Sequence, residues 1–305
     1  YGVAFTQPVL DADWLSTLNE NAFELAVSLG PQAGPQEGFA LIAQFYTGDD
    51  ATQFVVGQYA DQVIVMIGDD YKHRIKRPRI WTSLSQSQLA NGVDIVIRSV
   101  NGGASIALDG VIAAARVDLP LPIPHAPGDT RVVIANSVYA SHQWQGELRR
   151  FELRGIGVLE APLAYTMGDL RRQRVVGTGA IDSTLWVPPR RVIVERRYLQ
   201  WPFDHQFEFN RGFLIDLFQN LVGFIPLGFA LVWSRVRLPG LNALASAVVV
   251  AGLTSVFIEL SQAWMPSRDS SALDFTLNTI GGGVGAFLLV SLLSTGEQSE
   301  RQLPG

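Results

Sequence analysis

The chain has 305 residues, a formal net charge of -5 and no cysteine. This length allows more than one domain, and the lack of cysteine excludes disulfides and thiolate metal sites. The negative charge, without a basic helix or a basic-aromatic stripe, argues against a nucleic-acid-binding protein. Only 17% of the residues are charged, and the apolar excess lies almost entirely after Phe213. The two halves of the chain therefore call for separate interpretation.

The segment from Phe23 to Gly155 consists of short runs in which apolar and polar residues alternate between turn residues. This alternation predicts half-buried strands, about eight in number. Asn101-Gly102-Gly103 and Asp109-Gly110 predict two tight hairpins. The expected strands are 23–29, 38–47, 52–59, 61–68, 93–100, 104–110, 131–138 and 143–155. Strands at this spacing, with no helical period between them, favour an all-β sandwich or jelly roll.

The order of these segments resembles the concanavalin A-like (laminin-G-like) sandwich family. The resemblance rests on FELAVSL, on the late SIALDG strand and on the closing IANSVYASHQWQGELRRFELRG. In that family a Trp-x-Gly step, here Trp144 and Gly146, leads into the last strand. We expect this domain to span residues 1–158. The resemblance implies that it binds glycans or proteins, and in some family members calcium.

Two acidic turns hold the obvious oxygen donors for calcium, namely Asp49, Asp50, Asp69 and Asp70. The simpler interpretation is that both turns are solvated, because no second ligand pattern accompanies them. The histidines His73, His125, His142 and His205 are scattered singly. We therefore expect no histidine metal site and no cofactor apart from this calcium alternative.

Residues 159–211 show no long period of either kind and are expected to be a connector. The end of this stretch combines arginines and aromatic residues, namely Arg196, Arg197, Trp201, Phe203 and Phe207. Rings and guanidinium groups together are typical of an anchor at the membrane–water interface. A linker packed on the sandwich is the alternative.

Three apolar segments follow: Phe213–Trp233, Leu241–Trp264 and Leu273–Leu293. Each is about the 20 residues that a helix needs to cross the hydrocarbon layer. A buried hairpin of a soluble domain would need amphipathic faces, which these segments lack. We therefore predict an all-α transmembrane domain over residues 212–295, followed by a polar tail, 296–305. Because the chain begins at Tyr1 without a signal-like segment, a further span upstream is also an expectation.

Each predicted span carries a pair of polar residues on one helical face. The pairs are Asp216 with Asn220, Glu259 with Gln262, and Asp274 with Asn278. Antiparallel helices with short loops bring all three pairs to the same membrane surface, beside Arg268. Polar groups are costly in lipid and should face one another or a wet cavity. They predict either a pocket for a polar headgroup or reacting bond, or polar contacts between helices in which Arg268 neutralises a carboxylate.

Small residues and a proline predict how these helices pack. Gly281 and Gly285 form a small-xxx-small step that lets helices approach closely. Pro226, with a glycine two residues later, is expected to break or bend the first span. Arg235 and Arg237 mark the loop between the first two spans as cytoplasmic by the positive-inside rule. The sandwich and the polar cluster are then expected outside the cell.

The membrane part resembles the VanZ-like family. The first block is an Asp and an Asn ahead of a Gly-Phe-x-Pro-x-Gly step, here Asp216, Asn220, Gly223, Phe224, Pro226 and Gly228. The second block is Glu-x-x-Gln, Pro-x-Arg and Asp-x-x-x-Asn-x-x-Gly, here Glu259, Gln262, Pro266, Arg268, Asp274, Asn278 and Gly281. The resemblance implies an association with low-level resistance to glycopeptide antibiotics such as teicoplanin.

The leading hypothesis is a multi-pass protein of a bacterial-type cell membrane. Its sandwich would bind glycan, peptidoglycan or other wall material, and its helices would present the seven polar residues to an amphiphile or a lipid-linked precursor. Arg268 would pair with a phosphate or carboxylate. One alternative is a membrane hydrolase or transferase with Glu259 or Asp274 as general base, but no nucleophile elbow, bundle histidine or metal-ligand set supports it. Another is a structural anchor that displays a binding domain.

Overall fold

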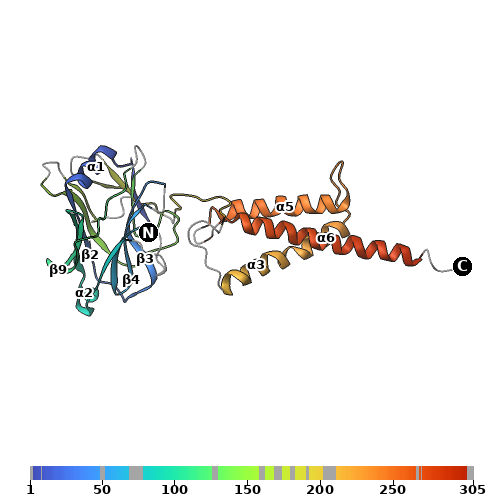
Figure 1. Cartoon of the computed structure of the whole chain (residues 1–305), viewed down its shortest axis with the longest axis horizontal. Helices are drawn as coiled ribbons and strands as arrows, with labels where there is room; N and C mark the ends of the chain where they lie inside the picture. Colours follow the sequence, from blue (N-terminus) through green and yellow to red (C-terminus); the bar gives the residue numbers. More distant parts are fainter. Residues whose placement is uncertain are drawn as a thin grey trace. The chain divides into compact units, whose positions relative to one another are not determined.

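The structure is a computed structural model that divides into two compact units, Tyr1–Glu195 and Arg196–Gly305. We describe each unit by itself (Figure 1). The description covers residues 3–7, 9–48, 52–68, 78–125, 130–157, 162–167, 174–178, 183–189, 192–201, 211–265, 268 and 270–300.

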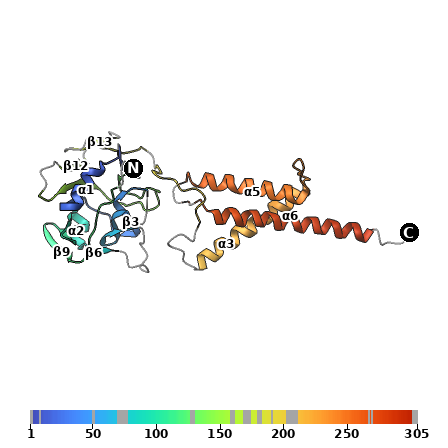
Figure 2. The ribbon, with the colours of Figure 1, turned by 45° about the horizontal axis from the view of Figure 1, so that its top comes forward.

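The first unit is a sandwich of two antiparallel sheets (Figures 1 and 2). In the described residues, one sheet has the order β13-β14-β1-β10-β3-β4-β5-β6. Its strands are β1 Ala4–Gln7, β3 Gln36–Tyr46, β4 Phe54–Ala60, β5 Gln62–Ile67, β6 Arg79–Ser83, β10 Arg131–Ile134, β13 Arg174–Val176 and β14 Thr184–Trp186. The other sheet has the order β12-β11-β2-β7-β8-β9. Its strands are β2 Ala22–Leu29, β7 Val93–Val100, β8 Gly103–Leu108, β9 Val111–Arg116, β11 Leu148–Gly155 and β12 Leu163–Thr166. The predicted sandwich is confirmed.

Large aromatic side chains fill the core between the two sheets. Phe45 packs edge-to-face on Phe54 with ring centroids 5.6 Å apart, and Phe151 lies between Phe45 and Tyr165. Such pairs add to the stabilisation that comes from burial alone. Burial raises the pKa of Tyr165 to about 12, against the opposing effect of its hydrogen bond with Ser183. The phenol therefore stays neutral in the core.

Local sequence signals identified several turns correctly. The β7–β8 hairpin turns at Asn101 (φ 52°) and Gly102 (φ 75°), and the β8–β9 hairpin turns at Asp109 (φ 50°) with a glycine after it. Positive φ at both central positions is the requirement of a type I′ turn. In the Trp-x-Gly step, a Cβ on Gly146 would lie 2.2 Å from the Trp144 ring, so only glycine admits that ring. The step leads into β11 as expected, although further strands follow.

The structure adds elements that the sequence analysis did not predict. Two helices, α1 Ala12–Asn21 and α2 Gln86–Asn91, are labelled in Figure 2. Helix α1 buries Trp14 and two leucines against the core, and helix α2 starts with a capping box at Ser85. Strands β12, β13 and β14 lie within the stretch expected to be a connector, and each pairs with a neighbouring strand. The expected sandwich boundary at residue 158 therefore falls inside the first compact unit.

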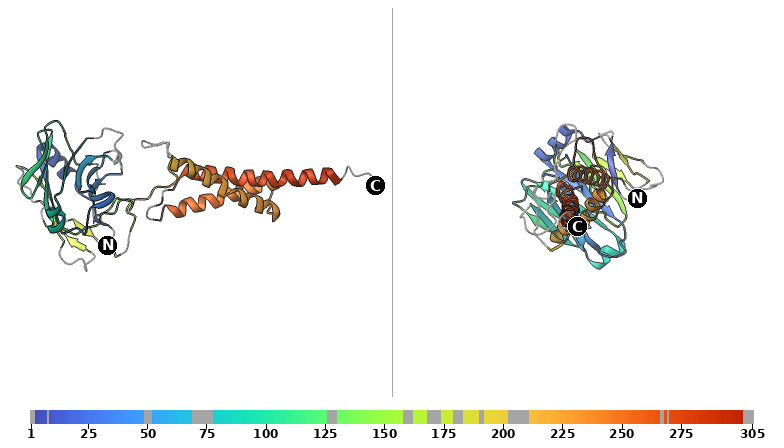
Figure 3. Two further views of the ribbon diagram at one scale, coloured as in Figure 1. Left: turned by 90° about the horizontal axis from the view of Figure 1, so that it is seen from below. Right: turned by 90° about the vertical axis from the view of Figure 1, so that its right-hand side faces the viewer.

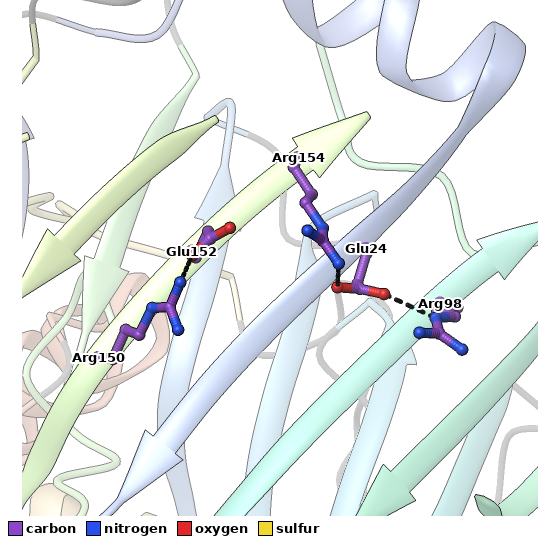
Figure 4. Close-up of polar contacts among 5 residues, drawn as sticks. All are labelled: Glu24, Arg98, Arg150, Glu152 and Arg154. Atoms are coloured by element: carbon purple, nitrogen blue, oxygen red, sulfur yellow. Dashed lines mark hydrogen bonds and ion pairs between the residues drawn. The ribbon is translucent and has the colours of Figure 1, made fainter. Parts of the chain in front are cut away.

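The outer face of the sheet that runs from β12 to β9 carries a row of charged side chains on three of its strands (Figure 4). Glu24 on β2 is nearly covered and accepts hydrogen bonds from Arg98 on β7, at 2.7 Å, and from Arg154 on β11. Arg150 and Glu152 form a separate ion pair on β11. Burial raises the pKa of Glu24, but the hydrogen bonds and charges of its two arginine partners outweigh burial and leave that pKa below its ordinary value.

The second unit consists of helices α3 Arg211–Gly223, α4 Ile225–Trp233, α5 Ala243–Gln262 and α6 Ala272–Glu300 (Figure 3). Among the residues that the structure describes, three segments are long and apolar enough to cross a membrane, namely Phe213–Trp233, Ala243–Gln262 and Ala272–Ser294. The three predicted spans are confirmed. The first is broken at Phe224, and Pro226 lies in the first turn of α4, where it costs no hydrogen bond.

Glycines bring α6 against the broken first span. A Cβ on Gly281 would lie 2.0 Å from the Leu221 carbonyl oxygen, and one on Gly285 would lie 1.9 Å from that of Ile225. Gly228 meets the Gly282 carbonyl in the same way, at 1.8 Å. The helices therefore touch backbone to backbone, so the expected close approach at Gly281 and Gly285 is confirmed.

Candidate functional site

The turn between α5 and α6 is built around Glu259. This side chain, near the end of α5, is 1% exposed and accepts a hydrogen bond from the backbone N–H of Ser271 at 2.7 Å. The Ser271 hydroxyl in turn accepts from the backbone N–H of Asp274 at 3.2 Å, as a residue that caps a helix does. In a capping box, the acidic residue three positions on would accept the N–H of the cap. Here Glu259, from the other helix, takes that role.

Asp274 interacts with the Ser271 side chain and also with the first span. Its carboxylate interacts with the amide of Asn220 and, through space, with the carboxylate of Asp216, both on α3. The Glu259 carboxylate also lies close enough to repel Asp274. Asp216 is exposed, whereas Asn220 and Asp274 are half-buried. Three of the predicted pocket residues from two helices therefore meet at an accessible position, and we call Asp216, Asn220 and Asp274 the acidic group.

A second polar contact lies one helical turn deeper. Asn278 is 3% exposed and donates from its amide nitrogen to the Ser255 hydroxyl at 3.0 Å. Ser255 precedes Glu259 by one turn, and Asn278 follows Asp274 by one turn, so both pairs share the α5–α6 interface. The side-chain oxygen of Asn278 has no hydrogen-bond partner in the described part of the chain. An acceptor buried in this way is costly unless a donor reaches it.

The two remaining predicted residues take no part in these contacts. Gln262 is half-exposed at the end of α5. Arg268 is exposed in the α5–α6 turn, and its side chain forms no ion pair within the described residues. Its expected pairing with a carboxylate of the cluster is thus not found among them. The catalytic role considered for Glu259 and Asp274 stays a hypothesis.

The segment before the first span docks on the same turn. The Arg196 guanidinium lies 3.7 Å from the centroid of the Trp264 ring, a cation–π contact. Backbone and hydroxyl hydrogen bonds join Leu199 and Gln200 to Ser270. Trp201 beside them is half-exposed, in agreement with an interfacial anchor, whereas Phe203 and Phe207 lie outside the described residues.

The described residues give no evidence for a metal site. No group of three His, Cys, Asp or Glu side chains there is arranged to hold a metal ion. The proposed calcium donors Asp49, Asp50, Asp69 and Asp70 lie outside the described residues, as do His73 and His205. His125 contacts Asn19, and His142 contacts Ser141.

The sequence analysis did not identify two serines of this site, Ser255 and Ser271. Ser271 could have been found, because Ser271-x-x-Asp274 ahead of an apolar run is a helix-start signal. Ser255 offered no such signal, since a lone serine in an apolar segment is more often a small packing residue.

The VanZ/LLP1 family model matches residues 172–293, which is less than half of the chain. The match includes all three candidate spans apart from the last residue of the third, and it also takes in β13 and β14. The predicted resemblance of the membrane region to this family is confirmed. No curated protein matches the chain.

Solved structures that are similar to this chain include the following three. The binding domain of botulinum neurotoxin DC in complex with SialylT is 10% identical, with 45% of this chain and 33% of that chain covered and a TM-score of 0.33. The Ruminococcus gnavus IT-sialidase CBM40 is 9% identical over 45% and 78% of the two chains, with a TM-score of 0.36. The SAP-like pentraxin of Limulus polyphemus is 11% identical over 50% and 69%, with a TM-score of 0.34. The chain spans about a third of the toxin chain, and all three TM-scores are below 0.5, so these likenesses support no inference about ligands.

Proposed function

We propose that the chain is a multi-pass protein of the bacterial cell envelope whose helical unit binds the headgroup of an amphiphile that donates hydrogen bonds. The observation that carries this proposal is that Glu259, and not Asp274, accepts the N–H of the capping residue Ser271. A carboxylate that accepted this N–H would use one of its acceptor positions within the turn. Instead, Asp274 joins Asn220 and Asp216 at an accessible position of a membrane-spanning unit.

The chemistry of the site indicates the type of headgroup. The two carboxylates of the acidic group are hydrogen-bond acceptors, so they favour a ligand with N–H or O–H donors. Negative charge favours an ammonium group over a neutral hydroxyl. Arg268 is at the same end of the helices, because it lies in the turn that joins α5 to α6, and it offers a cationic fork for a phosphate or carboxylate. A zwitterionic headgroup with an ammonium and a phosphate fits this set.

The test compares two lipids that differ in donor capacity. Phosphatidylethanolamine carries an ammonium with N–H donors, whereas phosphatidylcholine carries a quaternary ammonium without them. We expect the full chain in detergent to retain the first lipid in preference to the second, measured by native mass spectrometry. Asp274→Asn and Asp216→Asn should each lower the retained fraction severalfold. Equal retention of both lipids by the wild-type protein would contradict the proposal.

Glu259→Gln is the matched control. An amide oxygen can still accept the Ser271 N–H, so this variant should keep normal abundance and lipid retention. If Asp274→Asn and Asp216→Asn lower only the abundance of folded protein, the acidic group holds helices together and the chain is an anchor. Loss of retention at normal abundance supports the binding site.

We further propose that the same site lowers the susceptibility of cells to teicoplanin-type glycopeptides. The match of residues 172–293 to the VanZ/LLP1 family supports this proposal. Cells expressing the wild-type chain should tolerate a higher teicoplanin concentration than cells expressing Asp274→Asn at equal membrane abundance. Equal tolerance of the two strains would separate the lipid site from this phenotype.

We also propose that the sandwich lies outside the cytoplasm, where it contacts glycan or wall material. The support is Arg235 and Arg237, both exposed in the loop between α4 and α5, which the positive-inside rule assigns to the cytoplasm. The chain has no cysteine, so single cysteines can be labelled selectively. Met265→Cys should react with an impermeant maleimide in intact cells, and Ser234→Cys only after lysis. The opposite pattern would reverse the topology.

A further inference from the structure

The sandwich has a groove where the last strands of its two sheets meet. β6 ends one sheet and β9 ends the other, and the two strands lie against each other. The chain that leaves β9 completes the groove, which has a volume of about 460 Å³. Its lining includes Pro78, Arg79, Trp81, Arg116, Asp118 and Pro120. This volume is within the range of small-ligand sites.

Trp81 gives the groove a flat apolar surface. Its side chain lies on the water-facing side of β6 and is 53% exposed, which is unusual for a tryptophan. Arg79 lies two residues earlier on β6, so both side chains project from the same face of the strand. An open indole beside rigid prolines provides a surface on which the C–H face of a sugar ring can stack.

The charges in the groove favour an anion. Arg116 pairs with Asp118 at 3.3 Å, and the hydrogen bond and charge of this arginine hold the pKa of the exposed Asp118 carboxyl below its ordinary value. Arg79 forms no ion pair within the described residues. One guanidinium group is thus left without an internal counter-charge beside the indole. Guanidinium groups bind carboxylates and phosphates through two parallel hydrogen bonds.

The sandwich has a second cavity of about 270 Å³, which shares one lining residue with the groove. Arg116 lines both cavities, and the second also contains Asn101, Ser105 and Arg98. These side chains offer hydrogen-bond partners of both kinds for hydroxyl groups. A ligand longer than one ring can therefore extend from Trp81 past Arg116.

We propose that this groove binds an oligosaccharide that carries an acidic group, with a ring stacked on Trp81 and the anion on Arg79. Asp118 accepts hydrogen bonds from ring hydroxyls, and the next residue occupies the cavity beyond Arg116. This inference deepens the proposed contact of the sandwich with glycan and rests on it. The acidic group is a carboxylate or a phosphate, which present the same oxygen pair to an arginine.

The test uses the full chain in lipid nanodiscs and measures ligand affinity by calorimetry. The probes are oligogalacturonate, its neutral methyl ester and an oligosaccharide phosphate. We expect the two anionic probes to bind at least about tenfold more tightly than the ester, because the charge-assisted contact to Arg79 is lost in the ester. Added salt should reduce this difference. The comparison between the two anionic probes identifies the acidic group.

Trp81→Ala and Arg79→Gln should each weaken binding by about tenfold or more. Tyr59→Ala is the matched control, because that ring is 50% exposed on β4 and does not line the groove. Normal binding by Trp81→Ala and Arg79→Gln would overturn this site while leaving glycan binding by the sandwich intact. Binding of none of the probes overturns the acidic-sugar proposal. Because lipid retention is measured separately on Asp274→Asn, failure here is distinguishable from failure of the headgroup site.

Discussion

The two units bury opposite kinds of side chain. The sandwich encloses large aromatic rings, including Phe45, Phe54 and Phe151. The helical unit instead buries small and polar residues, namely Ser246, Ala247, Ala251, Gly252, Ser255, Glu259, Asn278 and Gly281. Many of its large apolar side chains, such as Phe257 and Phe287, are exposed, although Val232 and Leu289 are buried. In the sandwich, water drives rings inward.

Hydrocarbon surrounds the spans and gives no such inward drive, so contact between helices depends on close packing and hydrogen bonds. Burial alone is therefore a poor guide to importance in this chain. An exposed phenylalanine in the helical unit can pack favourably against lipid chains. A buried glycine there determines whether two helix backbones can come into contact. Four sets of substitutions test how the two units differ.

The largest effect is expected in the sandwich core. Phe54→Ala should destabilise the sandwich by about 3–5 kcal/mol, because it leaves a cavity among fully buried rings. Phe257→Ala deletes the same atoms on α5, where the ring is 73% exposed, and should leave the stability of the helical unit nearly unchanged. Hydrogen exchange of strand and helix amides measures both. A comparable loss from Phe257→Ala would show that this ring has a protein partner.

The next effect concerns the contact of α6 with the first span. Gly285→Ala places a methyl group 1.9 Å from the Ile225 carbonyl oxygen and should cost about 1–3 kcal/mol. Gly283→Ala is the matched control, since its nearest neighbour is a Val248 methyl group at 3.4 Å. Both changes improve helix propensity equally, so the difference between them isolates the contact. Thermal melting in detergent measures it, and equal melting temperatures would refute backbone-to-backbone packing.

A smaller effect is expected at the buried polar pair. Ser255→Ala removes the acceptor of the Asn278 amide and should cost about 0.6–2 kcal/mol in a membrane. Ser261→Ala serves as the control, because that hydroxyl bonds only to a carbonyl of its own helix, that of Phe257. Detergent melting of the two variants should differ by this amount. A larger loss from Ser261→Ala would contradict the assignment.

The smallest effect is the pH dependence from Glu24. A carboxyl whose folded pKa is depressed contributes stability above its unfolded pKa, about 4.3, and loses it as the pH falls through the folded value. The sandwich should therefore melt at progressively lower temperature below about pH 4. Glu24→Gln should flatten this acid limb, and Arg98→Gln should flatten it partly. An unchanged slope in Glu24→Gln would assign the acid sensitivity to other carboxyls.

The parts of the fold that were predictable depend on local rules. Asn-Gly and Asp-Gly specify their turns by themselves, and an apolar run of about 20 residues specifies a span. Strands β13 and β14 have three residues each, too few for alternation to be visible. Helix α2 has six residues and is identified by its capping box rather than by a period. Such short elements owe their existence to tertiary pairing, which no local pattern contains.

The candidate site was predictable in position but not in its division of roles. Counting crossings placed Asp216, Asn220 and Asp274 at one end of the helices, and in the structure the Asp274 carboxylate interacts with the Asn220 amide and with the charge of Asp216. The partner of Glu259 is a backbone N–H, which has no signature in residue type. Arg268 was expected either to neutralise a carboxylate between helices or to pair with a ligand, and its exposed position in the turn leaves it available to solvent or ligand.

The pairing of β14 with β1 has a practical consequence for the design of fragments of this protein. Phe5 on β1 pairs with Trp186 on β14, so residues within the VanZ/LLP1 match supply strands to the sandwich. A fragment that stops at residue 158 would leave one side of β1 open, and an open strand edge recruits strands from other molecules. A soluble fragment should instead extend through Glu195, the last residue of the first compact unit, so that it keeps the core residue Val187. The start of the family match and the end of the folded sandwich unit therefore lie at different positions in the sequence.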